Sequence, residues 1–266
     1  MKYVVVTGAY GGIGKGIVKR LKDNGYFIFA LDKKVENKED NVFPIECDIT
    51  DISSINNAYD IIKSETTEIS AIIHFAGIYY LDSLLEISEE RFKKIFEVNV
   101  FGPYLLNKTF LPLLHKGSKI LMTTSELATL DPLPFTGLYG ITKTALDKYS
   151  YSLRMEAQLL GIYVSVIRPG AVRTLMLDTS TKELDNFVNN TKLYNVSSEN
   201  FRNVVNSVEA KYITPEKLAK KVLKIIRKEK PKFNYSINRN KLLILLNIFP
   251  KRFRFWVIKK ILTKNK

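Results

Sequence analysis

The sequence is poor in the residues that build metal sites and disulfides. It has one cysteine, Cys47, and two histidines among 266 residues. A single thiol excludes an internal disulfide, and no cysteine or histidine spacing matches a metal site. We therefore expect neither a metal centre nor a disulfide scaffold.

We also expect no leader sequence. The N-terminus runs from Met1 directly into an apolar strand and a glycine-rich turn, without the hydrophobic stretch and cleavage site of a signal peptide. We expect a cytoplasmic location, either free or peripheral on the inner membrane surface.

Acidic residues are scarce only at the C-terminal end. Residues 227–266 contain 13 lysines or arginines and one acid, Glu229, which gives a net charge of +12. The remaining 226 residues carry 28 basic and 26 acidic groups and contribute only +2 to the total of +14. A nearly neutral body with a basic tail differs from the basic face of a nucleic-acid-binding protein. We expect no nucleic-acid partner.

The body of the chain has the length and apolar content of one large α/β domain, because 45% of the residues are hydrophobic. Apolar strand segments alternate with amphipathic helical segments, which predicts a doubly wound parallel sheet with helices on both faces. The predicted strands are residues 2–7, 26–31, 42–46, 71–74, 119–123 and 162–167, with a seventh edge strand at 233–237. We assign residues 1–238 to this domain.

A glycine-rich turn joins the first strand to the first helix. Gly8, Gly12 and Gly14 follow the strand, and apolar residues of one helical face follow them. Glycines let the backbone approach a pyrophosphate, and a helix N-terminus supplies free N–H groups with a positive potential. The order strand, glycine turn, helix therefore predicts a Rossmann-type dinucleotide site rather than a purely structural turn.

An acidic residue, Asp32, ends the second strand. An acid there can hydrogen-bond the adenosine ribose and would repel a 2′-phosphate. Lys33 and Lys34 follow directly, and either could pair with such a phosphate. We favour NAD as the cofactor and keep NADP as the alternative.

The most informative pattern is Tyr139-x-x-x-Lys143, at the start of a helical run over residues 139–160. Residues four apart share a helical face, so the ammonium can lie near the phenol. A phenol has an unperturbed pKa of about 10, and a nearby cation lowers this pKa by favouring the phenolate. The pattern alone is common on helices, but here it accompanies the glycine turn, Asn99 after an apolar helix and Ser125 after an apolar strand.

With these motifs in this order, residues 1–237 resemble the single-domain branch of the short-chain dehydrogenase/reductase family. The resemblance implies an NAD(P)-dependent oxidoreductase that interconverts an alcohol and a carbonyl by hydride transfer. It implies that Tyr139 exchanges the substrate proton and that Ser125 orients the substrate oxygen. It also implies that Lys143 binds the nicotinamide ribose and lowers the tyrosine pKa, and that Asn99 holds a relay water. Ser125 lies 14 residues before Tyr139, one more than the family's commonest spacing, so Thr124 is the alternative serine position.

The resemblance also supplies a cofactor-binding set, drawn from the glycine turn and the ends of the strands. Its members are Gly8, Gly12, Ile13, Gly14, Asp32, Asp48, Ile49, Ala76, Gly77, Tyr139, Lys143, Pro169, Gly170, Val172 and Thr174. One motif departs from the family, which has Asn-Asn-Ala-Gly where this chain has His74-Phe75-Ala76-Gly77. We interpret His74 as a buried hydrogen-bonding histidine rather than a catalytic base.

The family's variable substrate lid falls on residues 175–212, a polar segment with scattered aromatics. These aromatics, with Leu130, Leu133 and Phe135, favour a small apolar substrate of steroid, retinoid or lipid type. The alternatives are a reductase of acyl-carrier or polyol substrates and a non-catalytic, cofactor-sensing module at a membrane. The complete catalytic set argues against the sensor. The apolar run over residues 100–114 implies, by resemblance, a homodimer or homotetramer.

Residues 239–266 form a basic, apolar C-terminal extension. Its two apolar pieces are separated by Pro250, and neither approaches the ~20 residues that span a bilayer. Two short helices with aromatic and basic residues over residues 241–262 suit peripheral contact with a membrane surface. Packing on the body or on a second subunit is the alternative, and the sequence favours neither.

Overall fold

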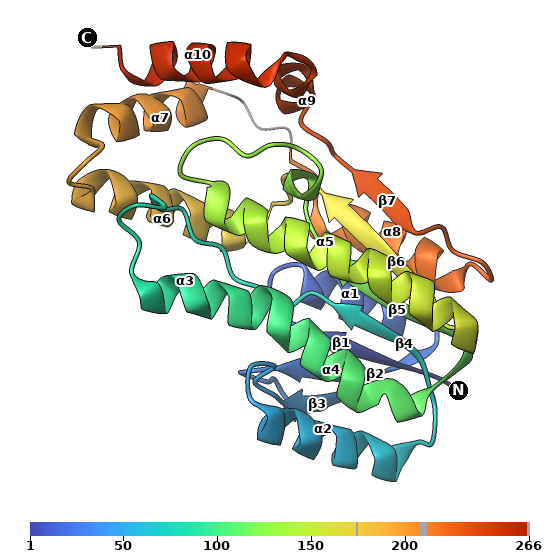
Figure 1. Cartoon of the computed structure of the whole chain (residues 1–266). Helices are drawn as coiled ribbons and strands as arrows, with labels where there is room; N and C mark the ends of the chain where they lie inside the picture. The colour runs from blue at the N-terminus through green and yellow to red at the C-terminus, as the bar shows by residue number, and fades with distance from the viewer. Residues whose placement is uncertain (174, 208–211, 265–266) are drawn as a thin grey trace.

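The computed structural model describes residues 1–173, 175–207 and 212–264. Within them one parallel sheet runs in the order β3-β2-β1-β4-β5-β6-β7 (Figure 1). The strands are β1 (Lys2–Thr7), β2 (Tyr26–Asp32), β3 (Val42–Glu46), β4 (Ile69–His74), β5 (Leu114–Thr123), β6 (Tyr163–Pro169) and β7 (Asn234–Ile237). The predicted doubly wound sheet is confirmed, and β7 pairs in parallel with β6 at the edge.

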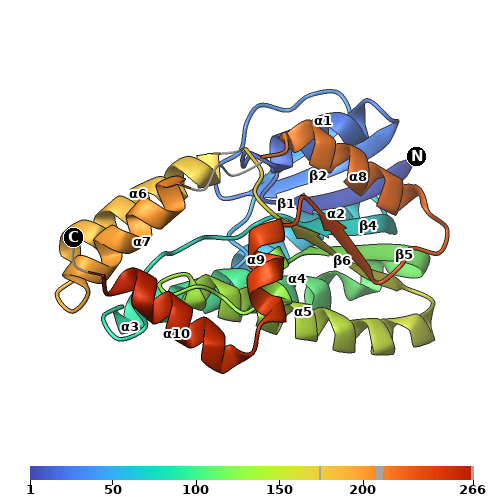
Figure 2. The same cartoon turned by 90° about the horizontal axis from the view of Figure 1, so that it is seen from above.

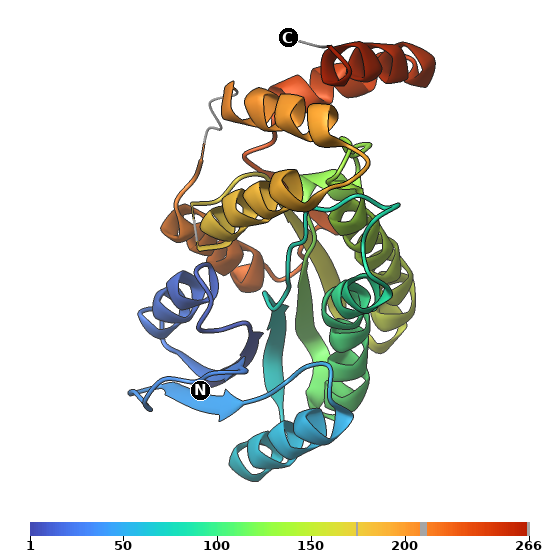
Figure 3. The same cartoon turned by 90° about the vertical axis from the view of Figure 1, so that its left-hand side faces the viewer.

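Helices cover both faces of this sheet (Figures 1 and 3). One face carries α1 (Gly14–Lys22) and α8 (Pro215–Arg227), and the other carries α2 (Ile52–Glu65), α4 (Gly102–Phe110) and α5 (Gly137–Ala157). Helix α3 (Glu89–Phe96) continues through a π-helical turn (Glu97–Phe101) into α4, and 3₁₀ turns span Leu111–Leu113, Glu126–Ala128 and Gln158–Leu160. The strand alternation explains the two layers, because Val4 and Val6 face α1 and α8 whereas Val5 faces α2 and α4.

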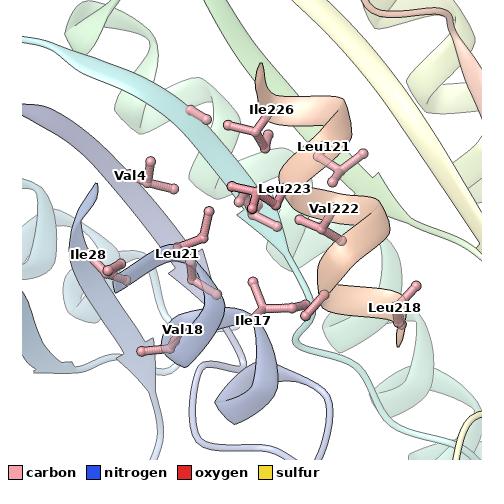
Figure 4. Packing of buried hydrophobic residues seen from close by; sticks show 14 of the residues in the cluster. Val4, Ile17, Val18, Leu21, Ile28, Leu121, Leu218, Val222, Leu223 and Ile226 are labelled. Atoms are coloured by element: carbon pink, nitrogen blue, oxygen red, sulfur yellow. The ribbon is translucent and has the colours of Figure 1, made fainter. Parts of the chain in front are cut away.

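Helices α1 and α8 lie side by side on the sheet (Figure 4). Ile17 and Leu21 of α1 meet Val222 and Ile226 of α8 in a fully apolar contact. The helices approach closely at Gly16, where a Cβ would lie 3.2 Å from the Cβ of Pro215. This packing fixes the N-terminus of α1 at the edge of the sheet where the glycine turn emerges.

The strand order reverses between β1 and β4. The chain builds β2 and β3 on one side of β1 and then crosses to build β4 to β7 on the other. In open α/β sheets such a switch point leaves a crevice beyond the carboxyl ends of the strands, and ligands bind there.

The lid and tail regions are helical and lie at one end of the molecule (Figures 1 and 2). The lid contains α6 (Leu175–Asn190) and α7 (Asn195–Ser207), and the tail contains α9 (Lys241–Ile248) and α10 (Lys251–Leu262). Leu262 of α10 packs against Phe201 of α7 and Leu184 of α6. No helix among the described residues is long and apolar enough to cross a membrane.

Candidate active site

A cavity of about 360 Å³ lies beyond the carboxyl ends of β1, β2, β3 and β4. Every cofactor-binding residue predicted for this part of the chain lines it: Gly8, Gly12, Ile13, Gly14, Asp32, Asp48, Ile49, Ala76 and Gly77. These residues come from the loops that follow four strands, and the switch in strand order brings the loops together.

Two glycines of the turn cannot carry a side chain. Gly8 has a φ of +65°, and a Cβ there would lie 2.5 Å from the backbone nitrogen of Ala76. A Cβ on Gly14 would lie 2.0 Å from the carbonyl oxygen of Gly8. The turn is therefore folded tightly against β4 and leaves the N-terminus of α1 at the wall of the cavity. The free N–H groups and positive potential of such a terminus fit a pyrophosphate.

Asp32 is held at the end of β2 by two backbone groups. Its Oδ2 accepts a hydrogen bond from the backbone N–H of Tyr10 at 2.9 Å, and its Oδ1 accepts one from the N–H of Lys33 at 2.8 Å. The ammonium of Lys33 pairs with Asp48 at 2.7 Å. Burial works to raise the pKa of Asp48, but hydrogen bonds from Lys33 and Thr50 outweigh it and hold that pKa below its usual value.

A second cavity, of about 280 Å³, adjoins the first and shares Ile13, Phe75, Gly77 and Ile78 with it. The predicted residues that line it are Ser125, Tyr139, Lys143, Pro169, Gly170 and Val172. Thr174, the last predicted cofactor residue, lies outside the described residues. The first cavity thus holds the predicted residues of the adenosine end, and the second holds three of the four predicted catalytic residues, Ser125, Tyr139 and Lys143.

Tyr139 and Lys143 lie on the first turns of α5, and Ser125 follows β5. The Ser125 hydroxyl accepts a hydrogen bond from the backbone N–H of Leu127 at 3.2 Å, and it lies near enough to Tyr139 to lower the pKa of that phenol. The Lys143 ammonium lies 5.5 Å from the centre of the Tyr139 ring and donates to the carbonyl oxygen of Thr123 at 3.2 Å. The structure therefore brings a phenol, a second hydroxyl and an amine to one wall of the cavity.

Thr124, the alternative to Ser125, also borders the cavity but its hydroxyl is used elsewhere. It donates to Asp147 at 3.3 Å, and Asp147 accepts two hydrogen bonds from Arg168, both at 2.8 Å. Of the two residues, only Ser125 acts on the pKa of Tyr139. Of the two hydroxyls, that of Ser125 therefore lies closer to the proposed chemistry.

Asn99 lies behind the cavity wall rather than in it. Its amide donates to the carbonyl oxygen of Ile78 and accepts from the Ile78 N–H, both at 2.9 Å, and it also donates to Thr142 at 3.2 Å. A Cβ on Gly77 would lie 3.2 Å from the Asn99 amide oxygen and 3.5 Å from the Lys143 ammonium. Asn99 occupies the π-helical turn between α3 and α4, and such turns often occur at functional sites. Its side chain therefore braces the backbone that separates the two cavities.

The expected lowering of the Tyr139 pKa is wrong for this structure. Burial raises the pKa of Tyr139 to about 12, against the hydrogen bond from Ser125, which lowers it. The ring is only half-buried because it borders the cavity, so solvent moderates this rise. Burial also lowers the pKa of Lys143 to about 8, which disfavours the ammonium form that was expected to lower the pKa of Tyr139. The cost of burying the ammonium is not offset by an ion pair, because the hydrogen-bond partner of Lys143 is a carbonyl oxygen and not a carboxylate.

His74 is a buried structural residue, as the sequence predicted. It is 3% exposed, and its Nε2 lies 2.9 Å from the amide oxygen of Asn107. Burial lowers its pKa to about 4, so the ring is neutral at physiological pH. It lines neither cavity, which leaves it no role as a catalytic base.

Several residues at the second cavity have no counterpart in the sequence prediction, among them Tyr79, Phe75 and Glu126. Tyr79 packs its ring edge-on against Tyr139 at 5.0 Å between centroids, and Phe75 and Glu126 also line the wall. Tyr79 and Phe75 lie in the segment after β4, where the sequence drew attention to the glycine and not to the aromatics. Among the described residues no group of three or more His, Cys, Asp or Glu could hold a metal ion.

Comparison with known proteins identifies relatives of the chain. The family model described as short chain dehydrogenase matches residues 2–185. The chain is 33% identical to estradiol 17-beta-dehydrogenase 2 of Mus musculus over 186 residues, which cover 65% of this chain and 49% of that enzyme. It is 28% identical to 3-amino-tetrahydro-pyrrolizinone reductase of Xenorhabdus hominickii over 270 residues, which cover 93% of each. The chain therefore spans about half of the mouse enzyme and nearly all of the Xenorhabdus one.

Solved structures share the fold at low sequence identity. A short chain dehydrogenase family protein of Francisella tularensis superposes with a TM-score of 0.75 at 23% identity, over 89% of this chain and 97% of that one. A 3-ketoacyl-(acyl-carrier-protein) reductase of Brucella melitensis, complexed with NADH, superposes with a TM-score of 0.72 at 20% identity, over 89% of this chain and 96% of that one. A short chain dehydrogenase of Burkholderia cenocepacia, in complex with NADP, gives 0.73 at 21% identity over the full length of both. The family match over more than half of the chain, on a fold with two adjoining cavities at its switch point, establishes that the chain belongs to the short-chain dehydrogenase family and is an NAD(P)-dependent oxidoreductase.

Proposed function

We propose that the chain interconverts a secondary alcohol and a ketone on a small apolar substrate, with NAD(H) as its cofactor. The observation that carries the proposal is that Ser125, Tyr139 and Lys143 line one cavity, which adjoins the glycine-lined one. A substrate oxygen placed between the two hydroxyls would lie next to the expected position of a nicotinamide ring.

The glycine turn and the strand ends fit the cofactor. Gly8, Gly12, Ile13 and Gly14 would hold the pyrophosphate, and Asp32 the adenosine ribose. The adenine would lie near Asp48 and Ile49, and the nicotinamide end near Lys143, Pro169, Gly170 and Val172. NAD(H) is favoured because Asp32 faces the cavity and Lys33 is already paired with Asp48.

The nicotinamide supplies or accepts the hydride when it is bound. In the reducing direction Tyr139 donates its proton to the carbonyl oxygen, and Ser125 stabilises the negative charge that develops there. The raised pKa keeps the phenol protonated at neutral pH and therefore able to donate. The Lys143 ammonium, 5.5 Å from the ring centre, then favours the phenolate that remains. A relay water at Asn99 would bind its backbone, since Ile78 and Thr142 already occupy its amide.

The walls of the second cavity favour an apolar substrate. Phe75, Ile78, Tyr79, Leu127 and Val172 surround Ser125 and Tyr139. The similarity to the mouse estradiol dehydrogenase supports a substrate of steroid, retinoid or lipid type. A reductase of acyl-carrier or polyol substrates, or a cofactor-sensing module, would use the same fold.

The test is a substrate panel followed by NADH or NADPH absorbance. It should contain sterol-type ketones, retinal-type aldehydes, a ketoacyl thioester and a sugar, each with both cofactors. The proposal predicts turnover on an apolar ketone with NADH in preference to NADPH. Turnover on the thioester or sugar alone would support the other reductase, and cofactor binding without turnover on any substrate would support the sensor.

We also propose that the chain forms a homodimer or homotetramer through α4 and α5. Both helices expose apolar side chains that the described residues leave uncovered: Tyr104, Ile141, Tyr151 and Met155, with Phe101 just before α4 and Leu111 just after it. Leu106, which the sequence placed in this interface, instead lies fully buried against the sheet. Mass measurement by light scattering would test the proposal, and a monomer at micromolar concentration would contradict it.

A further inference from the structure

The outer faces of α9 and α10 carry apolar side chains that nothing in the described chain covers. Six of them form what we call the tail surface: Leu242, Leu245, Ile248, Phe249, Phe253 and Trp256, each 42–74% exposed. The aromatic members are continuous across Pro250, since the rings of Phe249 and Phe253 lie 5.1 Å apart and those of Phe253 and Trp256 lie 6.0 Å apart. An exposed apolar row of this extent marks an interaction site more often than a solvated face.

Positive charge surrounds the tail surface. Lys241, Lys251, Arg252, Lys259 and Lys260 are exposed, and the Lys260 ammonium lies 5.1 Å from the Trp256 ring centre. No acidic residue occurs in residues 239–264. A ligand for this surface must therefore present apolar groups beside negative charge.

The inner faces of the same helices contact the body and each other. Arg254 pairs with Asp131 at 2.7 Å and donates to Asn247 at 3.0 Å. At the other end of α10, Asn200 of α7 donates to the carbonyl oxygen of Leu262 at 3.1 Å. Leu262 also packs into a buried apolar cluster, here called the lid cluster, whose other members are Leu81, Leu184, Phe187, Val188 and Phe201. Packing on the body thus explains one side of each helix, and the tail surface is the side it does not explain.

The tail is also joined to the wall of the substrate cavity. The backbone N–H of Asn240 donates to Glu126 at 2.6 Å, and Glu126 follows Ser125 and lines the cavity. The lid cluster that receives Leu262 also packs against Tyr79, another residue of the cavity wall. A partner bound to the tail surface would therefore be connected, through the tail helices, to two residues of the wall around Tyr139.

We propose that the tail surface docks on an anionic membrane surface and presents the substrate cavity to the bilayer. Aromatic and leucine side chains enter the interfacial layer, and the basic residues around them contact lipid phosphates. A second copy of the chain fits less well, because a two-fold contact would set the same basic residues against each other with no acid between them. The proposal goes beyond the reaction and does not depend on the identity of the substrate.

The single tryptophan of the chain, Trp256, reports directly on this surface. The full-length protein should be mixed with phosphatidylcholine vesicles, with and without phosphatidylglycerol. The proposal predicts a blue shift of tryptophan emission and co-flotation only with the anionic vesicles, and both should weaken as salt rises. Absence of flotation with anionic vesicles at low salt would overturn it.

Paired variants separate the tail surface from general stickiness. Lys259→Gln with Lys260→Gln should reduce the partition coefficient on the order of tenfold or more, because each basic residue near an anionic surface adds to the affinity. Phe253→Ser with Trp256→Ser should also abolish flotation. The matched controls, Lys220→Gln with Lys224→Gln on α8 and Leu159→Ser with Leu160→Ser after α5, should float like the unaltered protein.

Two results of the variant series would contradict the proposal. Equal loss in the control pairs would assign the binding to net charge or general hydrophobicity. A concentration-dependent blue shift without vesicles, with a doubled mass that Phe253→Ser with Trp256→Ser removes, would assign the surface to a second copy. The melting temperature and NADH binding of every variant serve as controls. If both are unchanged, the fold and the cofactor site are intact, and a loss of vesicle binding cannot be attributed to misfolding or to the failure of the proposed reaction.

Discussion

At the scale of single residues, burial decides the protonation of the groups around the substrate cavity. Lys143 is 5% exposed and has a carbonyl as its partner, and burial lowers its pKa to about 8. Tyr139 shifts the other way, to about 12. Both shifts favour the neutral form, which shows that solvent exclusion outweighs the attraction between the two side chains.

The Lys143 shift makes stability depend on pH. Its folded pKa of about 8 lies below the ordinary 10.5, so the buried charge costs stability below about pH 8 and costs nothing above about pH 10.5. Without cofactor, Lys143→Met should therefore raise the unfolding free energy near neutral pH, by roughly 2 kcal/mol. Urea unfolding across this pH range measures the effect. A difference between the two proteins that stays constant up to about pH 10.5 would contradict the assignment.

Asp32 should decide between the two nicotinamide cofactors. Asp32→Ser removes the carboxylate that would bond the ribose and repel a 2′-phosphate, so the preference for NAD(H) over NADP(H) should shrink by about tenfold or more. The ratio of kcat/KM for the two cofactors measures it. Equal use of both by the unaltered protein would mean that Lys33 or Lys34 offsets the acid.

At the scale of elements, the glycine turn depends on two close backbone approaches. A Cβ on Gly14 would collide with the Gly8 carbonyl at 2.0 Å, whereas a Cβ on Gly11 would lie 3.3 Å from the same oxygen. Gly14→Ala should therefore abolish NADH binding, and Gly11→Ala should largely keep it. Isothermal titration with NADH compares the pair, and equal affinities would show that the turn tolerates a side chain at Gly14.

A buried ion pair joins α5 to β6 just behind the cavity. The side chains of Asp147 and Arg168 are 11% and 14% exposed and share two hydrogen bonds of 2.8 Å. Asp147→Asn leaves the guanidinium without its counter-charge and should lower the unfolding free energy by about 3 kcal/mol. Glu89→Gln, which breaks the exposed pair with Lys93, should change it little. A similar loss of unfolding free energy in both variants would mean that the Asp147–Arg168 pair stabilises the fold no more than an exposed pair does.

At the scale of the whole molecule, local sequence patterns predicted the sheet. The environment of the side chains in the site depends on contacts between distant segments, which those patterns do not contain. The strands and the glycine turn follow from apolar runs and from glycine, features that short segments carry by themselves. The direction of the Tyr139 pKa does not, because it depends on atoms that α5, β5 and the segment after β4 bring together. The lid helices were not predicted. The Arg254–Asp131 pair was not predicted either, because its partners lie 123 residues apart and no periodic pattern in the sequence connects them.

The residues predicted for the site show the same division. The cofactor set converges because it lies in loops after parallel strands, whose carboxyl ends share one edge of the sheet. Tyr79 and Glu126 line the cavity through tertiary packing, and no motif contains them. Sequence therefore predicts the reaction class through its motifs, and the substrate-facing wall needs the structure.

The turnover of Tyr139→Phe on the best substrate of the panel tests whether Tyr139 is the acid–base residue. The variant keeps the ring that packs against Tyr79 but loses the hydroxyl that would exchange the proton. We expect kcat to fall by a factor on the order of 10² or more, with NADH affinity and melting temperature unchanged. Near-normal turnover in a folded variant that binds NADH would show that Tyr139 is not the acid–base residue and would contradict the central claim.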